Sequence, residues 1–387
     1  MLKATVGSSV DPDAYAAGKE AGGKAAALKD AQIAFVYSSC DYDQAALLKG
    51  LSEKLPGAFI LGCTSFTGVL TPEGFITGPK GYVAVMALAD SGITIGAAGL
   101  GKSGSARETG RAAARSAMAS ARKDVAPAYF YMVAPPGEEE SYLKGVEDVI
   151  GRVPFFGGSA ADNSVEGKWK VLFGKEAMSD GVALAFFYTD KSFANYYSGE
   201  YDATKTGGII TKVEGKRKLA EIDGEPALKK YAAWRGLDPD KLKGLTLLGE
   251  AICAPLGVKD RLGDLVAIRH PMVGNDDYSM NIGNDLAEGT AVILMKGSPD
   301  GLIASTGKAV KKVDERLGSK PGAYLLVHCG GRRGGIGDRM DEAYREIKKA
   351  AGDVPFIGVF TFGEYGYEDW GVNTCGGLML SFTGFSK

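Results

Sequence analysis

One pattern recurs three times along this chain and constrains its fold more than any other feature. Each copy reads as an apolar strand, a loop of small residues, an amphipathic helix and a short apolar strand ending at glycine, over residues 33–62, 129–157 and 324–358. Such a β-α-β unit has parallel strands and a right-handed crossover. Runs typical of hairpins interrupt the alternation. We therefore predict an α/β (mixed α+β) fold with repeated β-α-β units, added antiparallel strands and partly parallel sheets in two halves.

The repeated units also predict where a ligand binds. In open α/β sheets, ligands occupy the crevice beyond the carboxyl ends of the strands. Those ends are small, polar or rich in glycine, as a site lined by backbone amides requires. They comprise residues 38–40, 62–64, 157–159, 328–332 and 358–361.

The length of 387 residues allows two or three domains, each with its own core. Residues 200–245 change in character, because they are polar, contain lysine and glycine clusters and predict a single short helix over residues 226–235. We place a domain boundary there and expect domains over residues 1–224 and 225–387.

Charge and cysteine content exclude several classes of protein. A net charge of −2 gives no electrostatic footprint for nucleic acid or an anionic membrane. No apolar run approaches the length of a membrane span, and the N-terminus lacks the apolar stretch of a signal peptide. The 5 cysteines are odd in number and form no Cys-x-x-Cys pair, so we expect a reduced, cytoplasmic protein. With 2 histidines, we expect no His-based metal site. We also expect no cofactor.

The string His328-Cys329-Gly330-Gly331-Arg332-Arg333 is the most unusual in the chain, and it lies where a predicted parallel strand enters a glycine loop. A thiolate close to a histidine and two arginines would be a nucleophile. Cys329 is also explained as a small buried residue that ends a core strand, and that interpretation is favoured. For Arg332 a functional role is favoured, since an arginine beside two glycines can bind a carboxylate or phosphate in a bidentate manner.

Other polar residues at the predicted strand ends are further candidates. Glu364 suits either a ligand ammonium or a structural ion pair. Asn373 offers neutral hydrogen bonds, and Thr64 offers a hydroxyl beside Cys63, which reads as a core residue. Arg269 ends another predicted strand and can face the same crevice. A metal site built from widely spaced cysteines is disfavoured.

Residues 96–103 match the P-loop pattern letter by letter, and a P-loop holds nucleotide phosphates at a helix N-terminus. Two features argue against it. A capping box, Ser105 to Glu108, opens the following helix, so Lys102 precedes that helix. No downstream strand ends in an aspartate that could hold Mg²⁺. Nucleotide binding is therefore the weakest of the alternatives.

Taken together, these strings resemble the FIST family of sensory domains, which has an N-terminal and a C-terminal part. The similarity spans roughly residues 30–380 and rests on the order and spacing of the motifs. The motifs are Gly62-Cys63-Thr64, Gly157-Gly158, Ser179-Asp180-Gly181-Val182, Cys329-x-Gly331-Arg332, Gly358-x-x-Thr361-Phe362-Gly363-Glu364 and Asn373-Thr374. The family usually has tyrosine where this chain has Phe362, which removes a hydroxyl.

The resemblance implies a sensor of small ligands, with amino acids or related metabolites proposed for the family. An arginine would hold the carboxylate, Glu364 the ammonium, and polar groups at the glycine turns would fix the orientation. The ligand-binding residues expected on these grounds are Arg332, Glu364, Asn373, Thr361, Cys329, Arg269, Cys63 and Thr64. The family is often fused to signalling domains. Since no such domain follows here, we expect the signal to pass to a separate protein; whether the chain forms a homo-oligomer stays open.

Two other functions remain as alternatives to a non-enzymatic sensor. One is an enzyme that uses Cys329 with His328, although adjacent strand residues point to opposite faces and cannot easily form a direct dyad. The other is a nucleotide binder at residues 96–103.

Overall fold

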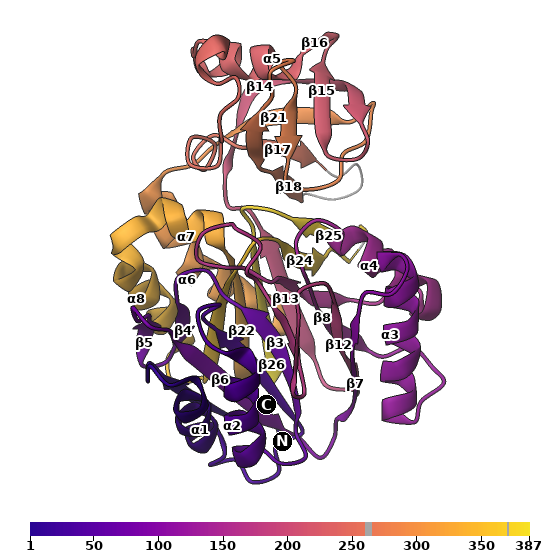
Figure 1. The fold of residues 1–387 in the computed structure, drawn as a ribbon, viewed down its shortest axis with the longest axis vertical. Coiled ribbons are helices and arrows are strands. Elements are labelled where there is room, and N and C mark those ends of the chain that lie inside the picture. The colour runs from indigo at the N-terminus through magenta and orange to yellow at the C-terminus, as the bar shows by residue number, and fades with distance from the viewer. Residues whose placement is uncertain (260–264, 370) are drawn as a thin grey trace.

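The computed structural model describes residues 1–259, 265–369 and 371–387 and consists of three similar units plus an insertion (Figure 1). Each unit runs strand, helix, strand, helix, strand, hairpin, strand. Unit 1 comprises β1 (Lys3–Ser9), α1 (Ala14–Ala25), β2 (Ile33–Ser38), α2 (Gln44–Lys54), β3 (Phe59–Thr64), β4 (Val69–Thr71), β5 (Gly74–Ile76) and β6 (Val83–Ala89). Unit 2 comprises β7 (Thr94–Gly101), α3 (Ala106–Ala121), β8 (Tyr129–Ala134), α4 (Glu139–Ile150), β9 (Phe155–Ser159), β10 (Val171–Phe173), β11 (Glu176–Met178) and β12 (Gly181–Tyr188).

Unit 3 repeats this order around the insertion and has a short additional helix. It comprises β13 (Phe193–Ser198), α6 (Pro299–Leu317), β22 (Pro321–Cys329), α7 (Gly330–Ile336), α8 (Met340–Ala351), β23 (Phe356–Thr361), β24 (Glu364–Tyr367), β25 (Asn373–Gly376) and β26 (Leu380–Ser386). The three predicted β-α-β units are confirmed, because β2 and β3, β8 and β9, and β22 and β23 are parallel pairs. The repeat is longer than the sequence pattern indicated, since it includes the preceding strand and helix as well as the closing hairpin and strand.

The units are joined by a cyclic exchange of hairpins. Each sheet takes four strands from one unit in the same spatial order and two from another unit. The sheets are β1-β6-β2-β3-β10-β11, β7-β12-β8-β9-β24-β25 and β13-β26-β22-β23-β4-β5. Strands from both sides of residue 225 therefore share a sheet.

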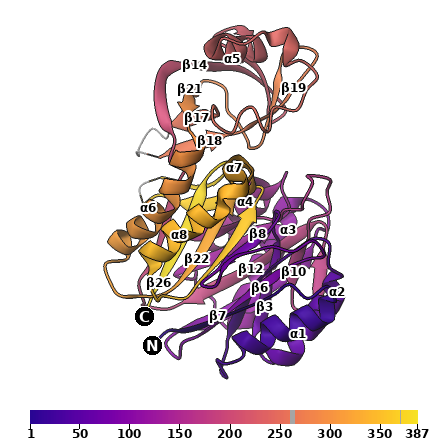
Figure 2. The same ribbon diagram turned by 90° about the vertical axis from the view of Figure 1, so that its left-hand side faces the viewer.

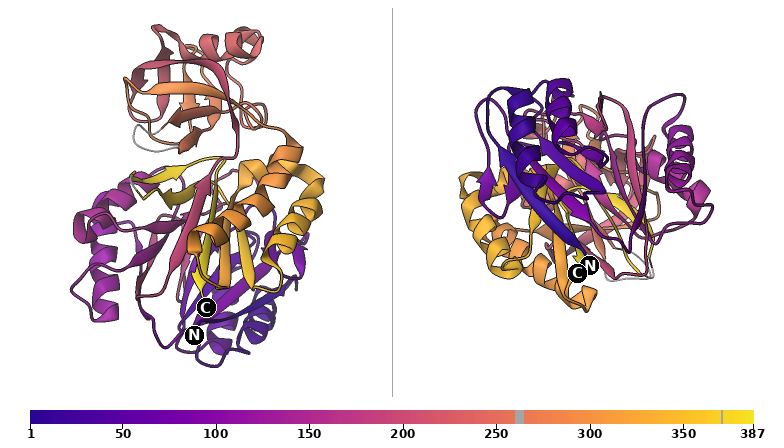
Figure 3. Two further views of the ribbon diagram at one scale, coloured as in Figure 1. Left: turned by 180° about the vertical axis from the view of Figure 1, so that it is seen from behind. Right: turned by 90° about the horizontal axis from the view of Figure 1, so that it is seen from below.

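The inner faces of the three sheets pack on one another, and the helices cover the outer faces (Figure 2). Phe35, Tyr131 and Leu325 occupy the shared core at equivalent positions of the three units, each fully buried or nearly so. Burial of each such side chain stabilises the fold by about 1.5–3 kcal/mol. The two chain termini lie side by side at the end of this body remote from the insertion (Figure 3).

Close helix packing explains several of the 56 glycines in the chain. In unit 2, α3 and α4 cross at Gly110 and Gly145. A Cβ added to Gly145 would lie 2.1 Å from the carbonyl oxygen of Arg107, and one added to Gly110 would lie 2.4 Å from that of Tyr142. Since side chains cannot occupy those positions, the helices approach each other through bare backbone. Helices α1 and α2 cross in the same way at Gly18 and Gly50.

The insertion forms a separate antiparallel sheet with its own core, joined to the body between β13 and α6 (Figures 1 and 3). Its elements are β14 (Asp202–Glu214), β15 (Lys218–Ile222), β16 (Glu225–Pro226), α5 (Ala227–Arg235), a 3₁₀ turn (Pro239–Lys241), β17 (Leu256–Lys259), β18 (Val266–Arg269), β19 (Pro271–Gly274), β20 (Met280–Ile282) and β21 (Ala291–Lys296). The sequence predicts α5 but not β14 or β15.

Three local expectations can be compared with this structure. The capping box is confirmed, since Ser105 and Glu108 exchange hydrogen bonds at the start of α3. The glycine-rich segment after Cys329 is not a loop as expected but the helix α7, with Cys329 as its N-cap. Among the described residues, no helix is both long and apolar enough to cross a membrane.

Candidate functional site

A cavity of about 440 Å³ lies between the three-unit body and the insertion. On the body side it is lined by residues at or just beyond the carboxyl ends of parallel strands from all three units. Phe66 follows β3, Gly137 follows β8, Trp169 follows β9, Cys329 ends β22 and Phe362 follows β23. The predicted crevice at the strand ends therefore exists, and the insertion closes it.

The insertion contributes the other wall. Its lining side chains include Arg217, Ile252, His270, Met272 and Asn284. Sequence reasoning did not select Arg217, His270 or Asn284 for this site, because nothing local shows that residues 202–297 fold back over the strand ends.

Cys329 is the one predicted site residue that lines this cavity. Its Sγ accepts hydrogen bonds from the backbone amides of Gly331 and Leu378, each at 3.2 Å. Burial raises the pKa of the Cys329 thiol, so it is protonated at neutral pH. His328 points to the opposite face of β22, where its ring lies 5.3 Å from that of Phe360. Burial lowers the pKa of His328 to about 3, and the two side chains form no dyad.

Glu364 and Thr361 lie behind Cys329, away from the cavity. The Thr361 hydroxyl donates to Glu364 Oε1 at 2.8 Å, and the Met379 amide donates to Oε2 at 2.9 Å. Burial raises the pKa of Glu364 to about 8, so this carboxyl is mostly protonated at neutral pH. The structure thus brings three predicted residues together, but as a buried, uncharged cluster.

Arg332, which the sequence predicts to bind a ligand, does not line this cavity. It is fully buried, with Nη1 donating to the Gly199 carbonyl and Nη2 donating to Ser305 Oγ at 2.6 Å. Its guanidinium lies 5.5 Å from the centre of the Tyr201 ring. On helix α7, Gly331 and Gly334 share the cavity face, and Arg332 projects from another face. Arg332 therefore holds the link between β13 and the insertion.

The remaining predicted residues are spread over the body and the insertion and take part in structural contacts. Thr64 Oγ1 accepts from the Lys170 amide at 2.8 Å, and Cys63 lies in the shared core. Asn373 donates to Glu147 at 2.9 Å, and Arg269 donates to the Ile268 carbonyl at 3.2 Å. These residues do not line the cavity.

Arg217 ties the insertion to the body through a cluster of carboxylates. It pairs with Glu139 at 3.1 Å and with Glu140, both at the start of α4, and with Asp285 at 3.1 Å. A further guanidinium N–H donates to the Gly283 carbonyl at 2.8 Å. Burial raises the pKa of Glu139, the Glu140 charge adds to the rise, and Arg217 opposes it. Three successive glutamates, residues 138–140, follow the end of β8 in the sequence. A search for charged residues beyond strand ends could have identified this cluster.

The segment that matches the P-loop pattern does not form a loop. Residues 96–101 belong to β7 and pair along their whole length with β12. Lys102 pairs with Glu138 and lies 3.3 Å from Asp180. A strand with paired backbone amides cannot wrap around phosphates.

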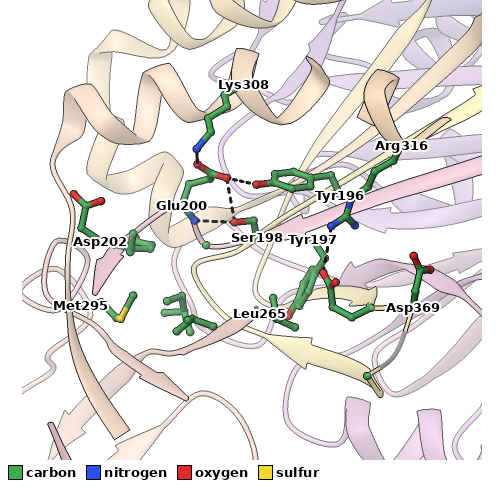
Figure 4. Close-up of a pocket in the computed structure, with 16 residues that line it drawn as sticks. Tyr196, Tyr197, Ser198, Glu200, Asp202, Leu265, Met295, Lys308, Arg316 and Asp369 are labelled. Carbon is green, nitrogen blue, oxygen red and sulfur yellow. Dashed lines mark hydrogen bonds and ion pairs between the residues drawn. The ribbon is translucent and has the colours of Figure 1, made fainter. Parts of the chain in front are cut away.

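A second cavity of about 570 Å³ lies at the junction between body and insertion (Figure 4). Both cationic side chains among its described lining residues are paired with glutamates of the same lining. Lys308 lies 2.6 Å from Glu200, and Arg316 lies 3.5 Å from Glu368. Ligand sites are usually apolar with a few placed polar groups, which describes the 440 Å³ cavity better.

Comparisons with known proteins identify both halves of the chain. The FIST N domain model matches residues 32–225, and the FIST C domain model matches residues 227–367. No curated protein matches. A cyanuric acid hydrolase from A. caulinodans shares 11% identity over the whole of both chains with a TM-score of 0.36. Phosphoribosylformylglycinamidine synthase II from Thermotoga maritima shares 10% identity over this whole chain and 72% of its own, with a TM-score of 0.24.

Both structural similarities are too weak to support an argument about fold or function. The two domain models lie in the order expected from the motifs and together account for most of the sequence. This chain belongs to the FIST family of sensory domain proteins.

Proposed function

We propose that this chain senses a small metabolite by binding it in the 440 Å³ cavity between the body and the insertion. The observation that carries the proposal is the convergence of all three units and the insertion on one space. Its volume lies within the usual range of ligand sites, and aromatic and aliphatic side chains dominate its lining. The family resemblance makes amino acids and related metabolites the first compounds to test.

The position of the cavity also provides a route for a signal. A ligand that contacts both the insertion and the strand ends stabilises the arrangement of insertion and body in which both contacts form. Helix α7 lines the cavity with Gly331 and Gly334, and its Arg332 holds the Gly199 carbonyl at the entry to the insertion. A change at the cavity therefore acts on the link as well. We propose that a separate cytoplasmic protein recognises the changed conformation and transmits the signal.

The test is a thermal-shift and calorimetry screen that includes a variant with a blocked cavity. Gly334 lines the cavity on α7, and a Cβ added there meets no atom within 4 Å. Gly334→Leu should therefore fold normally while its side chain occupies the binding space. Gly23→Leu is the matched control, since Gly23 is an exposed helical glycine of α1 with equally open surroundings.

At one hundred times its dissociation constant, a ligand stabilises the folded state by about 2.7 kcal/mol. We expect a compound that shifts Tm in the wild type and in Gly23→Leu but not in Gly334→Leu. Binding that persists in Gly334→Leu would place the ligand elsewhere and contradict the proposal.

A further inference from the structure

We propose that the ligand of this cavity is an uncharged molecule with an apolar, ring-sized body and an N–H or O–H group that donates to Asn284 Oδ1. The inference rests on the proposed function, because it takes the 440 Å³ cavity as the binding site. It favours neutral compounds, such as amides, lactams and related N–H donors, over free amino acids, which carry two charges.

The described lining of the cavity offers a ligand no unpaired charge. Among the described lining residues, those with titratable side chains are Arg217, His270 and Cys329. The guanidinium of Arg217 is already engaged by three carboxylates and a backbone carbonyl. The imidazole of His270, in the cavity wall, donates through Nε2 to the Leu248 carbonyl at 2.9 Å. Burial lowers the pKa of His270 to about 4, so the ring is neutral at pH 7. The Cys329 thiol accepts two backbone N–H groups and carries no charge.

A charged ligand would therefore lose its hydration without gaining a partner of opposite charge. Burial of an unpaired ion is far less favourable than burial of a neutral polar group that forms a hydrogen bond. A free amino acid would bring two such charges. Arg332 and Glu364, which the sequence suggested as their partners, point away from the cavity or lie behind its wall.

Asn284 is 1% exposed and lines the cavity. Its Nδ2 donates to Glu140 Oε1 at 3.3 Å, and this acceptor fixes which way the amide faces. Oδ1 is buried and has no hydrogen-bond partner. It lies beside Gly377, another lining residue, where an added Cβ would be 3.4 Å away. A buried acceptor without a donor costs stability, and a ligand N–H or O–H at this point would satisfy it.

Aromatic side chains shape one side of the cavity. Phe66, Trp169 and Phe362 form one continuous aromatic wall, with the ring of Phe362 5.8 Å from that of Phe66 and 6.2 Å from that of Trp169. Met272 and Leu378 lie in the lining as well. An apolar ring or branched chain suits this surface, with its polar group directed to Asn284.

The experiment is a binding screen with matched compound sets. Each set presents one apolar body as a primary amide, a methyl ester, a carboxylate and an amine; phenylalanine and N-acetylphenylalaninamide extend the series to the zwitterion and its neutral form. Binding is measured by ligand-observed NMR and calorimetry on the wild type, Gly334→Leu and Asn284→Leu. Asn284→Leu keeps the approximate size of the side chain but removes the acceptor.

We expect neutral amides to bind at least about tenfold more tightly than the matched carboxylates, amines and esters, and Gly334→Leu to abolish that binding. The preference of amide over ester should disappear in Asn284→Leu. If that variant does not fold, the ratio of amide affinity to ester affinity in the wild type still tests whether the ligand must donate a hydrogen bond. Charged members that bind best and are blocked by Gly334→Leu would overturn the ligand class but leave the proposed function intact. A screen in which Gly334→Leu blocks no binding would contradict both.

Discussion

The buried carboxyl of Glu364 allows a quantitative test of the uncharged cluster behind the cavity. Burial raises its pKa to about 8 from an ordinary value of 4.5. The folded state therefore binds this proton more tightly than the unfolded state does. Stability is full below pH 4.5 and falls as pH rises, until both states are ionised above pH 8.

The magnitude follows from these two values. Each unit of pKa difference corresponds to about 1.36 kcal/mol, so Glu364 alone should lower the free energy of unfolding by about 4 kcal/mol between pH 5 and pH 9. Glu364→Gln should remove this loss, because the amide mimics the protonated acid. Its oxygen can accept from the Met379 amide while its NH₂ donates to a rotated Thr361 hydroxyl.

The assay is urea unfolding of the wild type and Glu364→Gln at several pH values from 5 to 9. The difference between the two proteins cancels the titration of other groups. We expect the free energy of unfolding of Glu364→Gln, relative to that of the wild type, to increase as the pH is raised from 5 to 9. Parallel profiles, differing by less than about 1 kcal/mol over the range, would show that Glu364 is not held protonated and refute the reasoning.

Three further predictions follow from the fold. Gly145→Ala should destabilise the protein by about 2 kcal/mol or more, since its Cβ would meet the Arg107 carbonyl at 2.1 Å, whereas Gly23→Ala in open space should be neutral or stabilising; urea midpoints compare them. Burial lowers the pKa of His328 to about 3, so the stability that the protein has above pH 6.5 is lost as pH falls toward 3. His328→Phe should reduce this loss of stability at low pH, measured by unfolding curves over a pH series. The same loss in the variant would exclude His328 as its source. Arg217→Met leaves three carboxylates without their shared cation, so hydrogen exchange in residues 202–297 should quicken while the core strand β8 keeps its protection; equal exchange in both proteins would mean that the cluster does not hold the insertion.

The repeated architecture was largely predictable from the sequence because it depends on local signals. Apolar strands, amphipathic helices and closing glycines specify each β-α-β unit, and the capping box at Ser105 specifies where α3 begins. The opposite directions of His328 and Cys329 follow from strand geometry alone. The exchange of hairpins between units leaves no comparable local mark, since the three pairings depend on how the whole units pack.

The insertion and the site were harder to predict for a physical reason. Strand β14 has one fully buried side chain, Ile210, so its sequence lacks the alternation that indicates a strand. The cavity wall formed by His270 and Asn284 exists only because the insertion folds over the strand ends. The glycine-rich string after Cys329 predicts a loop, whereas the chain forms helix α7 there and Arg332 donates to the Gly199 carbonyl. The division of the chain into two domains near residue 225 stays a prediction.

The most direct test of the central claim is a crystal structure after soaking with the matched neutral and charged compounds. The account predicts density for a neutral amide in the 440 Å³ cavity, against the aromatic wall of Phe66, Trp169 and Phe362, with its N–H within hydrogen-bond distance of Asn284 Oδ1. Density only in the charged cleft beside Glu200 and Arg316, with the cavity holding no compound at saturating concentrations, would contradict it.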